Sequence, residues 1–525
     1  MGKEERVKEK KMFVGVSWNC AAELKYLITA LLFVCSVVTV VQFLPSRFSL
    51  SASDLRDCVS KLSAITSISN STSAISNSTS TISNSTSRSA PPQPPPPPSP
   101  APPPPPTPPP PVQDEVVDGG VIKRSFNPFG AAAYNFILMS AYRGGLNTFA
   151  VMGLASKPLH VFGKPSYQCE WIPHNTTAKH QPITTGGYKI LPDWGYGRVY
   201  TVVVVNCTFP IPVGDDRTGG QLLVHASTNG GGDRNFNLTD NITALVEAPG
   251  SLNPSYYTSA PKYDYLYCGS SLYGNLSPQR VREWLAYHVR LFGEKSHFVI
   301  HDAGGVHPAV MEVLRPWMEK GYVTLYDIKD QERFDGYYHN QFLIVNDCLH
   351  RYRFDARWMF FFDIDEFIFV PRKNTIKSVT DSLLGFTQFT IEQMTMSNKL
   401  CLSEDLRKTY RKWGFEKLVY RDVKRGIRRD RKYAVQPRNV FATGVHMSQN
   451  IVGKTTHKTE GRIKYFHYHG TIADRREPCR QLVNTTDITV DGTPYVLDTT
   501  MRDIAGTVKR FELKVIGNQL QRTRQ

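Results

Sequence analysis

The sequence predicts an α/β domain, with a mainly parallel sheet and helices on both faces, preceded by an antiparallel β-sandwich. From residue 256 to residue 525, short apolar runs alternate with segments that carry helix start signals, which is typical of a parallel sheet covered by helices. Between residues 121 and 255, β-prone runs are separated by glycine- and asparagine-rich turns, and helical spacing is hard to find. This second pattern favours a small sandwich.

The elements of the α/β domain follow one another in a regular order. Ser277 and Pro278 are a capping residue and a first-turn proline, so they mark the start of a helix. We expect strands near residues 263–271, 297–302 and 322–327, and helices near residues 278–292, 310–320 and 340–353. The last helix leads into an aromatic run at residues 358–362, which indicates a strand buried on both faces.

Three carboxylates follow this buried strand, at Asp363, Asp365 and Glu366. An unpaired charge is costly in a core, and the carboxyl edge of a parallel sheet is where open α/β folds bind ligands. In an extended chain Asp363 and Asp365 point the same way, and two neighbouring carboxylates suit a divalent cation that prefers oxygen, Mg²⁺ or Mn²⁺. The alternative is an acidic turn that pairs with some of the many Lys and Arg residues.

The N-terminal part is predicted to be a membrane anchor followed by a stem. Residues 26–44 are apolar and uncharged, and basic residues outnumber acidic ones in the tail at residues 1–25. Such a run can just cross a bilayer, and the charge bias predicts a cytosolic tail with a luminal remainder. A cleaved signal peptide is less favoured, because no small-residue cleavage site follows closely. Residues 45–120 contain a Ser/Asn/Thr-rich repeat and a long proline run, which predict a disordered stem.

A luminal orientation limits what the formal charge of +16 means. It argues against nucleic acid as the partner and leaves a membrane surface or an acidic polymer. Sequons outside the stem support this orientation; they begin at Asn175, Asn206, Asn237, Asn241, Asn275 and Asn484. The lumen also permits disulfides, and Cys169 and Cys207 could staple the sandwich. The aromatic residues Trp171, Tyr188, Trp194 and Tyr196 could stack on sugar rings, or they could be ordinary core and turn residues.

Five motifs occur in one order along the chain. They are Tyr337-Tyr338-His339-Asn340-Gln341, Asp363-Ile364-Asp365-Glu366-Phe367, Trp413-Gly414-Phe415-Glu416-Lys417, Gly444-Val445-His446 and Phe466-His467-Tyr468-His469. As a set, these motifs resemble glycosyltransferase family 92, and most closely its plant galactan synthases. The resemblance covers the chain from the anchor to the C-terminus and is strongest between residues 263 and 471.

The resemblance implies a single-pass type II enzyme of the Golgi membrane, with a GT-A catalytic domain behind a sandwich similar to a carbohydrate-binding module. Such an enzyme would be an inverting, metal-dependent β-1,4-galactosyltransferase that uses UDP-galactose and Mn²⁺, or alternatively Mg²⁺. Its acceptor would be the β-1,4-galactan side chains of pectic rhamnogalacturonan I. Members of this kind are also expected to form homodimers.

Roles for individual residues follow from the resemblance. Asp363 and Asp365 correspond to the Asp-x-Asp metal pair, and a C-terminal histidine often completes such a site, with His446 preferred and His467 as the alternative. Inversion requires a general base on the acceptor hydroxyl. Glu416 is the expected base, because a Trp-Gly pair followed by an acid resembles the acceptor-side loop of other inverting galactosyltransferases. An ion pair of Glu416 with a nearby Lys or Arg is the alternative.

Donor and acceptor contacts complete the expected site. The expected donor-binding residues lie at strand ends and at the start of the helix before the metal motif, and are Cys268, Ser270, Ser271, His301, Asp302, His339, Asn340 and Gln341. Trp413 and the basic pair Arg428 and Arg429 are expected to contact the acceptor or a galacturonate-bearing polymer. The alternatives are ordinary loop roles for the residues at the strand ends, a plain N-terminal helix residue for His339, and a solvated loop for Arg428 and Arg429.

Two other functions remain open at this point. The same scaffold could use another donor, or an N-glycan acceptor as some family 92 members do. A non-catalytic, membrane-tethered pectin lectin is the third interpretation, but such a lectin has no need of Asp363, Asp365 and Glu416 together.

Overall fold

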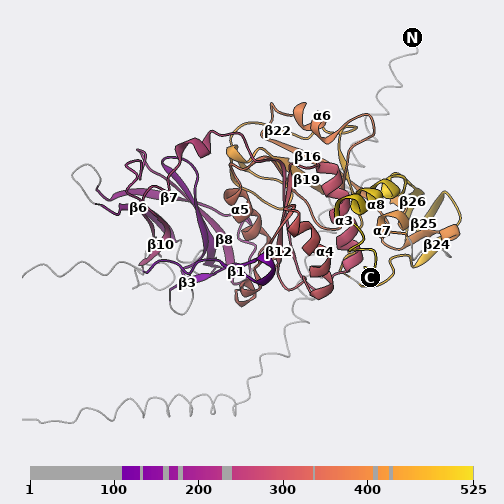
Figure 1. The fold of residues 1–525 in the computed structure, drawn as a ribbon, viewed down its shortest axis with the longest axis horizontal. Helices are drawn as coiled ribbons and strands as arrows, with labels where there is room; N and C mark the ends of the chain where they lie inside the picture. The colour runs from indigo at the N-terminus through magenta and orange to yellow at the C-terminus, as the bar shows by residue number, and fades with distance from the viewer. Residues whose placement is uncertain are drawn as a thin grey trace, which may run out of the picture. The chain divides into compact units, whose positions relative to one another are not determined.

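The structure, a computed structural model, describes residues 109–130, 134–157, 165–175, 181–227, 239–334, 337–405, 412–424, 430–473 and 475–523 (Figure 1). The predicted tail, the predicted membrane anchor and residues 45–108 of the predicted stem lie outside these ranges. Among the helices that the structure does describe, none combines the length and the apolar character that a bilayer span requires.

The larger part of the described chain is built on one eleven-stranded mixed sheet. Its strand order is β1 (Glu115–Val117), β2 (Val121–Lys123), β13 (Val323–Asp327), β12 (Ser296–Asp302), β11 (Tyr263–Leu272), β14 (Ala356–Phe361), β19 (Arg431–Val435), β16 (Gln388–Thr395), β23 (Lys464–His467) and β15 (Glu366–Phe369), with β22 (Thr455–Thr456) beside β16. The run from β2 to β14 is parallel. Beyond β14 the pairings are mixed, so a mainly parallel sheet describes only one half.

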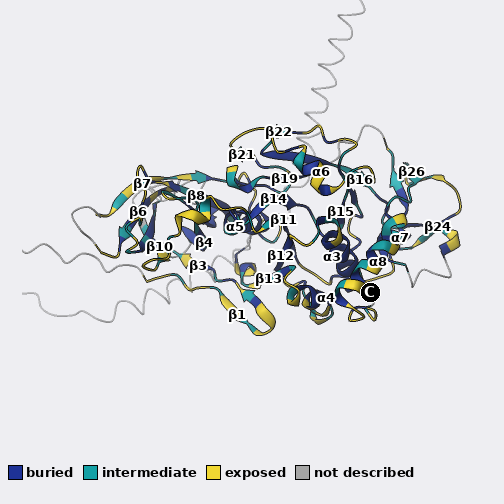
Figure 2. Cartoon of the chain, turned by 45° about the horizontal axis from the view of Figure 1, so that its top comes forward, coloured by how far each residue is buried: buried dark blue, intermediate teal, exposed yellow. Residues whose placement is uncertain are grey.

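Helices cover both faces of this main sheet (Figure 1). On one face lie α3 (Pro278–Phe292) and α4 (Pro308–Glu319), with α8 (Arg502–Ile516) packed on α3. On the other lies α5 (Gln341–Arg351), which also contacts the N-terminal strands. Helix α3 begins as predicted, because the Ser277 side chain caps it and Pro278 occupies its first turn. Figure 2 shows α3 and α5 buried along most of their length.

The N-terminal region is one antiparallel eight-stranded sheet, which corrects the prediction of a two-sheet sandwich. Its order is β10 (Thr239–Glu247), β9 (Gly220–Ser227), β6 (Ser166–Pro173), β7 (Ile183–Ile190), β8 (Tyr200–Thr208), β5 (Thr148–Ser156), β4 (Phe136–Arg143) and β3 (Asn127–Phe129). Strand β10, at one edge, also contacts β4, near the other edge. The sheet therefore curls around a core of its own, which includes the Cys169–Cys207 disulfide.

The valine run in β8 explains how this sheet joins the rest of the chain. Val203 and Val205 face the core of the N-terminal sheet, whereas Val202 and Val204 belong to a second core that includes α5. Successive side chains of a strand point to opposite faces, so an uninterrupted apolar run indicates a strand that is buried on both sides. One face of the N-terminal sheet is therefore buried against the main domain.

The predicted boundary at residue 120 also changes. Strand β1 lies within the predicted stem, and β2 lies within the predicted sandwich, yet β2 pairs in parallel with β13 of the main sheet.

A buried ion pair joins β2 to α5. Arg124 follows β2 and donates to Asp347 of α5, with Nη1 to Oδ2 at 2.6 Å and Nη2 to Oδ1 at 2.9 Å. Ser140 and Tyr142 of β4 donate to the same carboxylate. Burial raises the pKa of Asp347, but the charges of Arg124 and Arg351 outweigh it and hold that pKa well below its usual range.

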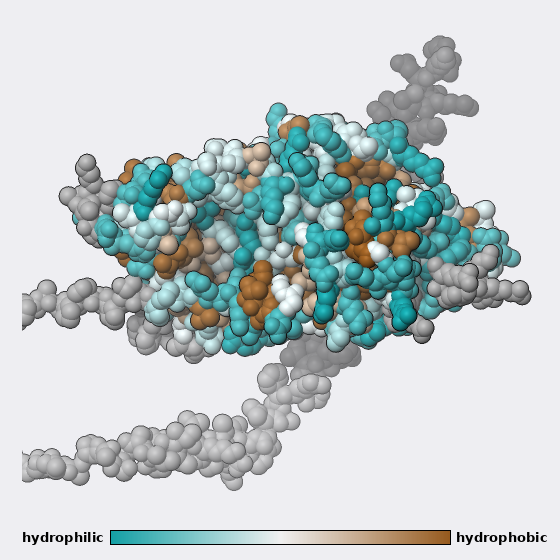
Figure 3. All heavy atoms as spheres, in the orientation of Figure 1, coloured by the Kyte–Doolittle hydropathy of each residue, from teal (hydrophilic) through white to brown (hydrophobic). Residues whose placement is uncertain are grey.

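Smaller elements complete the described fold. They are α6 (Ile376–Asp381), α7 (Gly414–Lys417), the pair β17 (Leu400–Leu402) and β24 (Gln481–Val483), the three strands β18 (Tyr420–Asp422), β26 (Thr493–Leu497) and β25 (Asp487–Val490), and the pair β20 (Val440–Ala442) and β21 (Asn450–Ile451). A further disulfide joins Cys401 to Cys479. The face seen in Figure 3 is mostly hydrophilic, with separate hydrophobic patches, as expected for a folded domain in water.

Buried neutral histidines predict a loss of stability in acid. Burial lowers the pKa of His288 and of His350 to about 3, and both rings hydrogen-bond to backbone carbonyls. Between pH 7 and pH 5 the unfolded chain takes up protons at these rings and the folded chain does not, so acid favours unfolding. Each histidine should then cost about 2 kcal/mol of unfolding free energy. Urea unfolding at the two pH values measures this, and His350→Gln should reduce the difference; equal differences for variant and wild type would contradict it.

Candidate active site

A cavity of about 610 Å³ opens at the carboxyl ends of β11 and β14. Residues 270–273 and 363–366 line it, and residues from β19, β23 and the loop between β7 and β8 join them. This is the edge at which a parallel sheet is expected to bind its ligand. A larger cleft of about 830 Å³ lies beside α4, but no cluster of carboxylates with histidines faces it among the described residues. The chemistry therefore points to the smaller cavity.

The acidic motif forms a turn between β14 and β15 rather than an extended pair. The Glu366 N–H donates to the Asp363 carbonyl at 3.1 Å, and the Asp363 N–H donates to the Glu366 carboxylate at 2.8 Å. The two aspartates therefore have different neighbours. This corrects the expectation that they point the same way from an extended strand.

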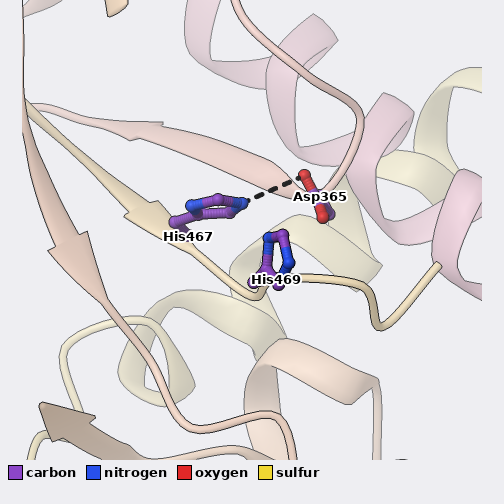
Figure 4. Close-up of side chains that lie close together, drawn as sticks. All are labelled: Asp365, His467 and His469. Carbon is purple, nitrogen blue, oxygen red and sulfur yellow. Dashed lines mark ion pairs between the residues drawn. The ribbon is translucent and has the colours of Figure 1, made fainter. Parts of the chain in front are cut away.

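Asp365 forms a cluster with two histidines (Figure 4). Its Oδ1 lies 3.5 Å from His467 Nε2, and one ligand atom each of Asp365, His467 and His469 lies within 4.8 Å of the others. Strand register causes this arrangement, because β15 and β23 pair with Glu366 opposite His467. His467 is the last residue of β23, and His469 lies in the turn that follows this strand.

The surroundings of this cluster hold it in place. The Gly470 N–H donates to Asp365 Oδ2 at 3.0 Å, and the Gln393 amide lies 2.5 Å from His467 Nδ1, which leaves Nε2 facing Asp365. Burial lowers the pKa of His467, but the hydrogen bond to Asp365 and the charges of Glu366, Asp365 and Asp363 together outweigh burial and raise the pKa. Burial likewise raises the pKa of Asp365, yet His467 brings the pKa below its usual value. One carboxylate and two imidazoles oriented by second contacts fit a divalent transition-metal ion.

Asp363 is held by a lysine instead. Lys432 Nζ lies 2.8 Å from Asp363 Oδ2 and 3.6 Å from Glu366 Oε2, and the lysine side chain is only 2% exposed. Burial lowers the pKa of Lys432, but Asp363 and Glu366 outweigh it and raise the pKa. Burial raises the pKa of Glu366 to about 7, in spite of Lys432. The cavity therefore contains a fixed cation beside the candidate metal cluster.

Comparisons with known proteins identify the family of the chain that carries this cavity. Residues 263–507 match the model of glycosyltransferase family 92. Galactan beta-1,4-galactosyltransferase GALS3 of Arabidopsis thaliana is 59% identical over 100% of this chain and 99% of its own length. The chain belongs to glycosyltransferase family 92. Two further Arabidopsis galactan beta-1,4-galactosyltransferases, GALS2 and GALS1, are 58% identical over 100% of this chain and 99% of their own, and 55% identical over 76% and 80%, respectively.

Within the family 92 domain, the structure separates the predicted metal ligands. Asp363, Asp365, His446 and His467 all line the cavity. However, only Asp365 and His467 belong to the converging cluster, whose third member is His469. His446 Nδ1 lies 3.2 Å from the Arg431 carbonyl, and burial lowers the His446 pKa. The arrangement favours the alternative histidine, His467, over His446.

The acceptor-side residues Trp413 and Glu416 lie elsewhere in the family 92 domain. Neither lines the cavity. Trp413 is 4% exposed and packs against Phe415. Glu416 accepts from the Trp413 N–H at 3.1 Å and forms an ion pair with Lys509. The structure corrects the prediction, because the Trp-Gly-acid pattern here caps a short helix instead of facing the cavity.

Three of the predicted donor-binding residues line the cavity, namely Ser270, Ser271 and Gln341. Gln341 Nε2 donates to Asp363 Oδ1 at 3.3 Å, which ties the start of α5 to the acidic turn. Cys268 is a correction, because it is fully buried and forms a disulfide with Cys348 of α5. That bond excludes a free thiol at the donor site.

The remaining predicted donor-binding residues do not line the cavity. His301 is buried and stacks on Tyr326. Asp302 accepts from the backbone N–H groups of Gly304 and Val306. His339 pairs with Glu332, and Asn340 is buried beside Gln331.

Most of the predicted glycosylation sites are exposed, and some predicted residues fall outside the described ranges. Asn175, Asn241, Asn275 and Asn484 are exposed and Asn206 is half-buried. Asn237, Arg428 and Arg429 lie outside the described residues. Attachment of a glycan at the exposed asparagines stays a prediction.

Sequence reasoning missed His469 and Lys432 as site residues. His469 carried a usable signal, because it follows His467 closely in the motif Phe466-His467-Tyr468-His469. Lys432 carried no signal that singles it out, because it is one of many basic residues between 421 and 432. Only the pairing of β14 with β19 brings it to the acidic turn.

Proposed function

We propose that this family 92 chain is an inverting β-1,4-galactosyltransferase. It moves galactose from UDP-galactose onto β-1,4-galactan side chains of rhamnogalacturonan I. The observation that carries the proposal is the Asp365, His467 and His469 cluster, which shares one cavity with Lys432. A chain 59% identical to a galactan beta-1,4-galactosyltransferase supports the choice of sugar and acceptor. The parallel run from β2 to β14, with its acidic turn at the carboxyl edge, supports a GT-A fold.

Asp365, His467 and His469 would hold the metal ion, and their two imidazoles favour Mn²⁺ over Mg²⁺. The ion would supply positive charge for the diphosphate that leaves the sugar. Lys432 adds a fixed positive charge to the same cavity, and it also pairs with Asp363. Gln341 orients Asp363, so that the turn keeps its geometry when a donor enters.

Asp430 is the general base in this proposal. It lines the cavity and is exposed, whereas Asp363 is paired with Lys432 and Asp365 belongs to the cluster. In the single displacement that inverts the sugar, the acceptor oxygen bonds to the anomeric carbon as the bond to phosphate breaks. The hydroxyl proton passes to the Asp430 carboxylate.

Asp430→Asn is expected to lower kcat by roughly 10²-fold, since an amide cannot take up the acceptor proton. Binding of UDP should stay unchanged. Steady-state kinetics and calorimetry with UDP measure the two effects. Glu416→Gln serves as the matched control, because Glu416 does not line the cavity. A large loss of kcat in Glu416→Gln, with Asp430→Asn near normal, would return the role to Glu416.

The decisive test of function uses the full-length protein in detergent. UDP-galactose, Mn²⁺ and a β-1,4-galacto-oligosaccharide are combined, and products are sized by mass spectrometry and analysed for linkage. Stepwise addition of β-1,4-linked hexoses is expected, and chelation of the metal should stop it. Transfer from another sugar nucleotide alone would replace the donor, and oligosaccharide binding without any transfer would indicate a lectin.

The proposal also covers the location, membrane orientation and oligomeric state of the enzyme. Residues 26–44 would anchor it in the Golgi membrane as a type II protein with the cavity in the lumen, and a homodimer is proposed there. The three described disulfides and the exposed sequons support an oxidising lumen. A protease-protection assay on isolated Golgi membranes would test the orientation.

A further inference from the structure

A row of exposed aromatic rings lines one side of the catalytic cavity. Its members, in order, are Trp194 at 65% exposure, Tyr196 at 62%, Tyr337 at 42%, Tyr338 at 58% and Tyr273 at 37%. Consecutive ring centroids lie 6.2, 6.0, 5.9 and 6.5 Å apart. Large aromatic side chains bury well, so a continuous exposed row at a cavity is a candidate binding surface.

The outer end of the row comes from the N-terminal sheet. Trp194 and Tyr196 lie in the loop between β7 and β8. Asp193 fixes the conformation of this loop through hydrogen bonds. Asp193 is fully buried, and its carboxylate accepts from the Gly195 N–H at 3.1 Å, the Thr201 hydroxyl at 2.7 Å and the Val202 N–H at 3.1 Å. Trp194 itself has a φ of 50°, a conformation that costs a non-glycine residue energy. The fold therefore holds these two rings outside any core.

The inner end of the row is tied to the predicted donor side. Tyr338 and His339 have φ values of 55° and 52°. His339 stacks on Tyr273 with ring centroids 4.0 Å apart, and its carbonyl accepts from the Ser271 hydroxyl at 2.9 Å. Ser271 lines the cavity at the end of β11. The row therefore runs from the strand end beside the acidic turn out to the N-terminal sheet.

We propose that Trp194, Tyr196 and Tyr337 form the acceptor subsite, on which the growing galactan chain stacks. This inference rests on the proposed function and assigns its acceptor side. Galactose carries one face of C–H groups that packs on an aromatic ring, while tyrosine hydroxyls can bond to sugar hydroxyls. The row carries no formal charge, which fits neutral β-1,4-galactan better than the acidic backbone. The N-terminal sheet is then part of the transferase site.

Trp194→Ala tests the subsite in the full-length protein in detergent, with a β-1,4-galactohexaose as the probe. We expect the acceptor KM and the hexaose Kd to rise roughly tenfold, the value of one lost ring stack. The KM for UDP-galactose and kcat at saturating acceptor should stay at wild-type values. Trp194→Phe keeps a ring and should retain most of the affinity, which separates loss of stacking from misfolding.

Tyr188→Ala is the matched control. Tyr188 lies in β7 of the same sheet and is 67% exposed, but it does not line the cavity. Its substitution should leave hexaose binding unchanged. If Trp194→Ala binds the hexaose as wild type does, or if Tyr188→Ala loses equal affinity, the proposed subsite is wrong. A rise in the KM for UDP-galactose alone would instead assign the aromatic row to nucleotide binding.

Failure of the proposed function gives a different result. If the wild-type chain transfers no galactose, the hexaose Kd still reports on the row. Weaker binding by Trp194→Ala would then keep the galactan subsite while removing the transferase. If the wild-type chain transfers galactose normally and Trp194→Ala keeps the wild-type hexaose Kd and acceptor KM, only the proposed subsite is wrong.

Discussion

Asp365→Asn should lower galactose transfer roughly 10³-fold, the loss expected when the charge that stabilises a leaving diphosphate is removed. The carboxylate is the one anionic member of the cluster with His467 and His469. An amide of the same shape keeps the turn but binds a divalent cation far more weakly. Titration with Mn²⁺, followed by electron paramagnetic resonance of the free ion, measures the lost binding directly and does not depend on turnover.

His446→Ala provides the control for this prediction. His446 lines the same cavity, but its imidazole lies outside the converging cluster. Its loss should leave Mn²⁺ affinity within a few-fold of wild type, while His467→Ala should weaken it in the same manner as Asp365→Asn. If His446→Ala abolished Mn²⁺ binding and His467→Ala did not, the ligand set proposed here would be wrong.

Lys432→Met should produce the second large effect, on stability and on donor binding together. Asp363 and Glu366 would lose their shared cation at a nearly fully buried position. Breaking a buried ion pair from one side costs about 3 to 5 kcal/mol of unfolding free energy. The affinity for UDP should fall as well, because the cavity loses a fixed positive charge. Urea unfolding and calorimetry with UDP measure the two effects.

The pH dependence distinguishes this explanation from simple misfolding. Burial already raises the pKa of Glu366 to about 7, and removal of Lys432 would raise it further. A protonated Glu366 no longer needs the cation, so the difference in unfolding free energy from wild type should be smaller at pH 6 than at pH 8. Lys432→Arg should keep most of the stability. The exposed Lys320→Met, at the end of α4, should change neither quantity, and a pH-independent loss in Lys432→Met would argue against charge pairing.

Local sequence signals predicted the elements of the fold well. Ser277 and Pro278 marked the start of α3, and apolar runs marked β11, β12 and β13 within a residue or so of their bounds. The acidic motif was found because charges that follow a buried aromatic strand need partners. The same local signal misled at Glu416, where Trp-Gly-acid spacing describes a helix cap as well as it describes an acceptor loop.

Long-range pairing decided the rest of the site. Cys268 was predicted to touch the donor because it lies at a strand end, but α5 packs on β11 and brings Cys348 to it. The N-terminal region was predicted to be a sandwich because short β-prone runs are separated by turn clusters, and such a pattern does not say whether the strands form two sheets or one sheet that curls on itself. No local sequence feature distinguishes Trp171 from Trp194, yet Trp171 is buried in a core and Trp194 is exposed at the cavity.

The sequence by itself determined the order of strands and helices, the place of the acidic motif after β14 and the family motifs, because caps, periodicity and buried charge are encoded within a few neighbouring residues. Tertiary structure alone decided that His467 and not His446 joins Asp365, that Lys432 holds Asp363 and that Trp194 reaches the cavity. These contacts depend on the register of β15 with β23, on the pairing of β14 with β19, and on the N-terminal sheet packing against α5. Register and packing join residues that are far apart in the chain, and no local pattern specifies them.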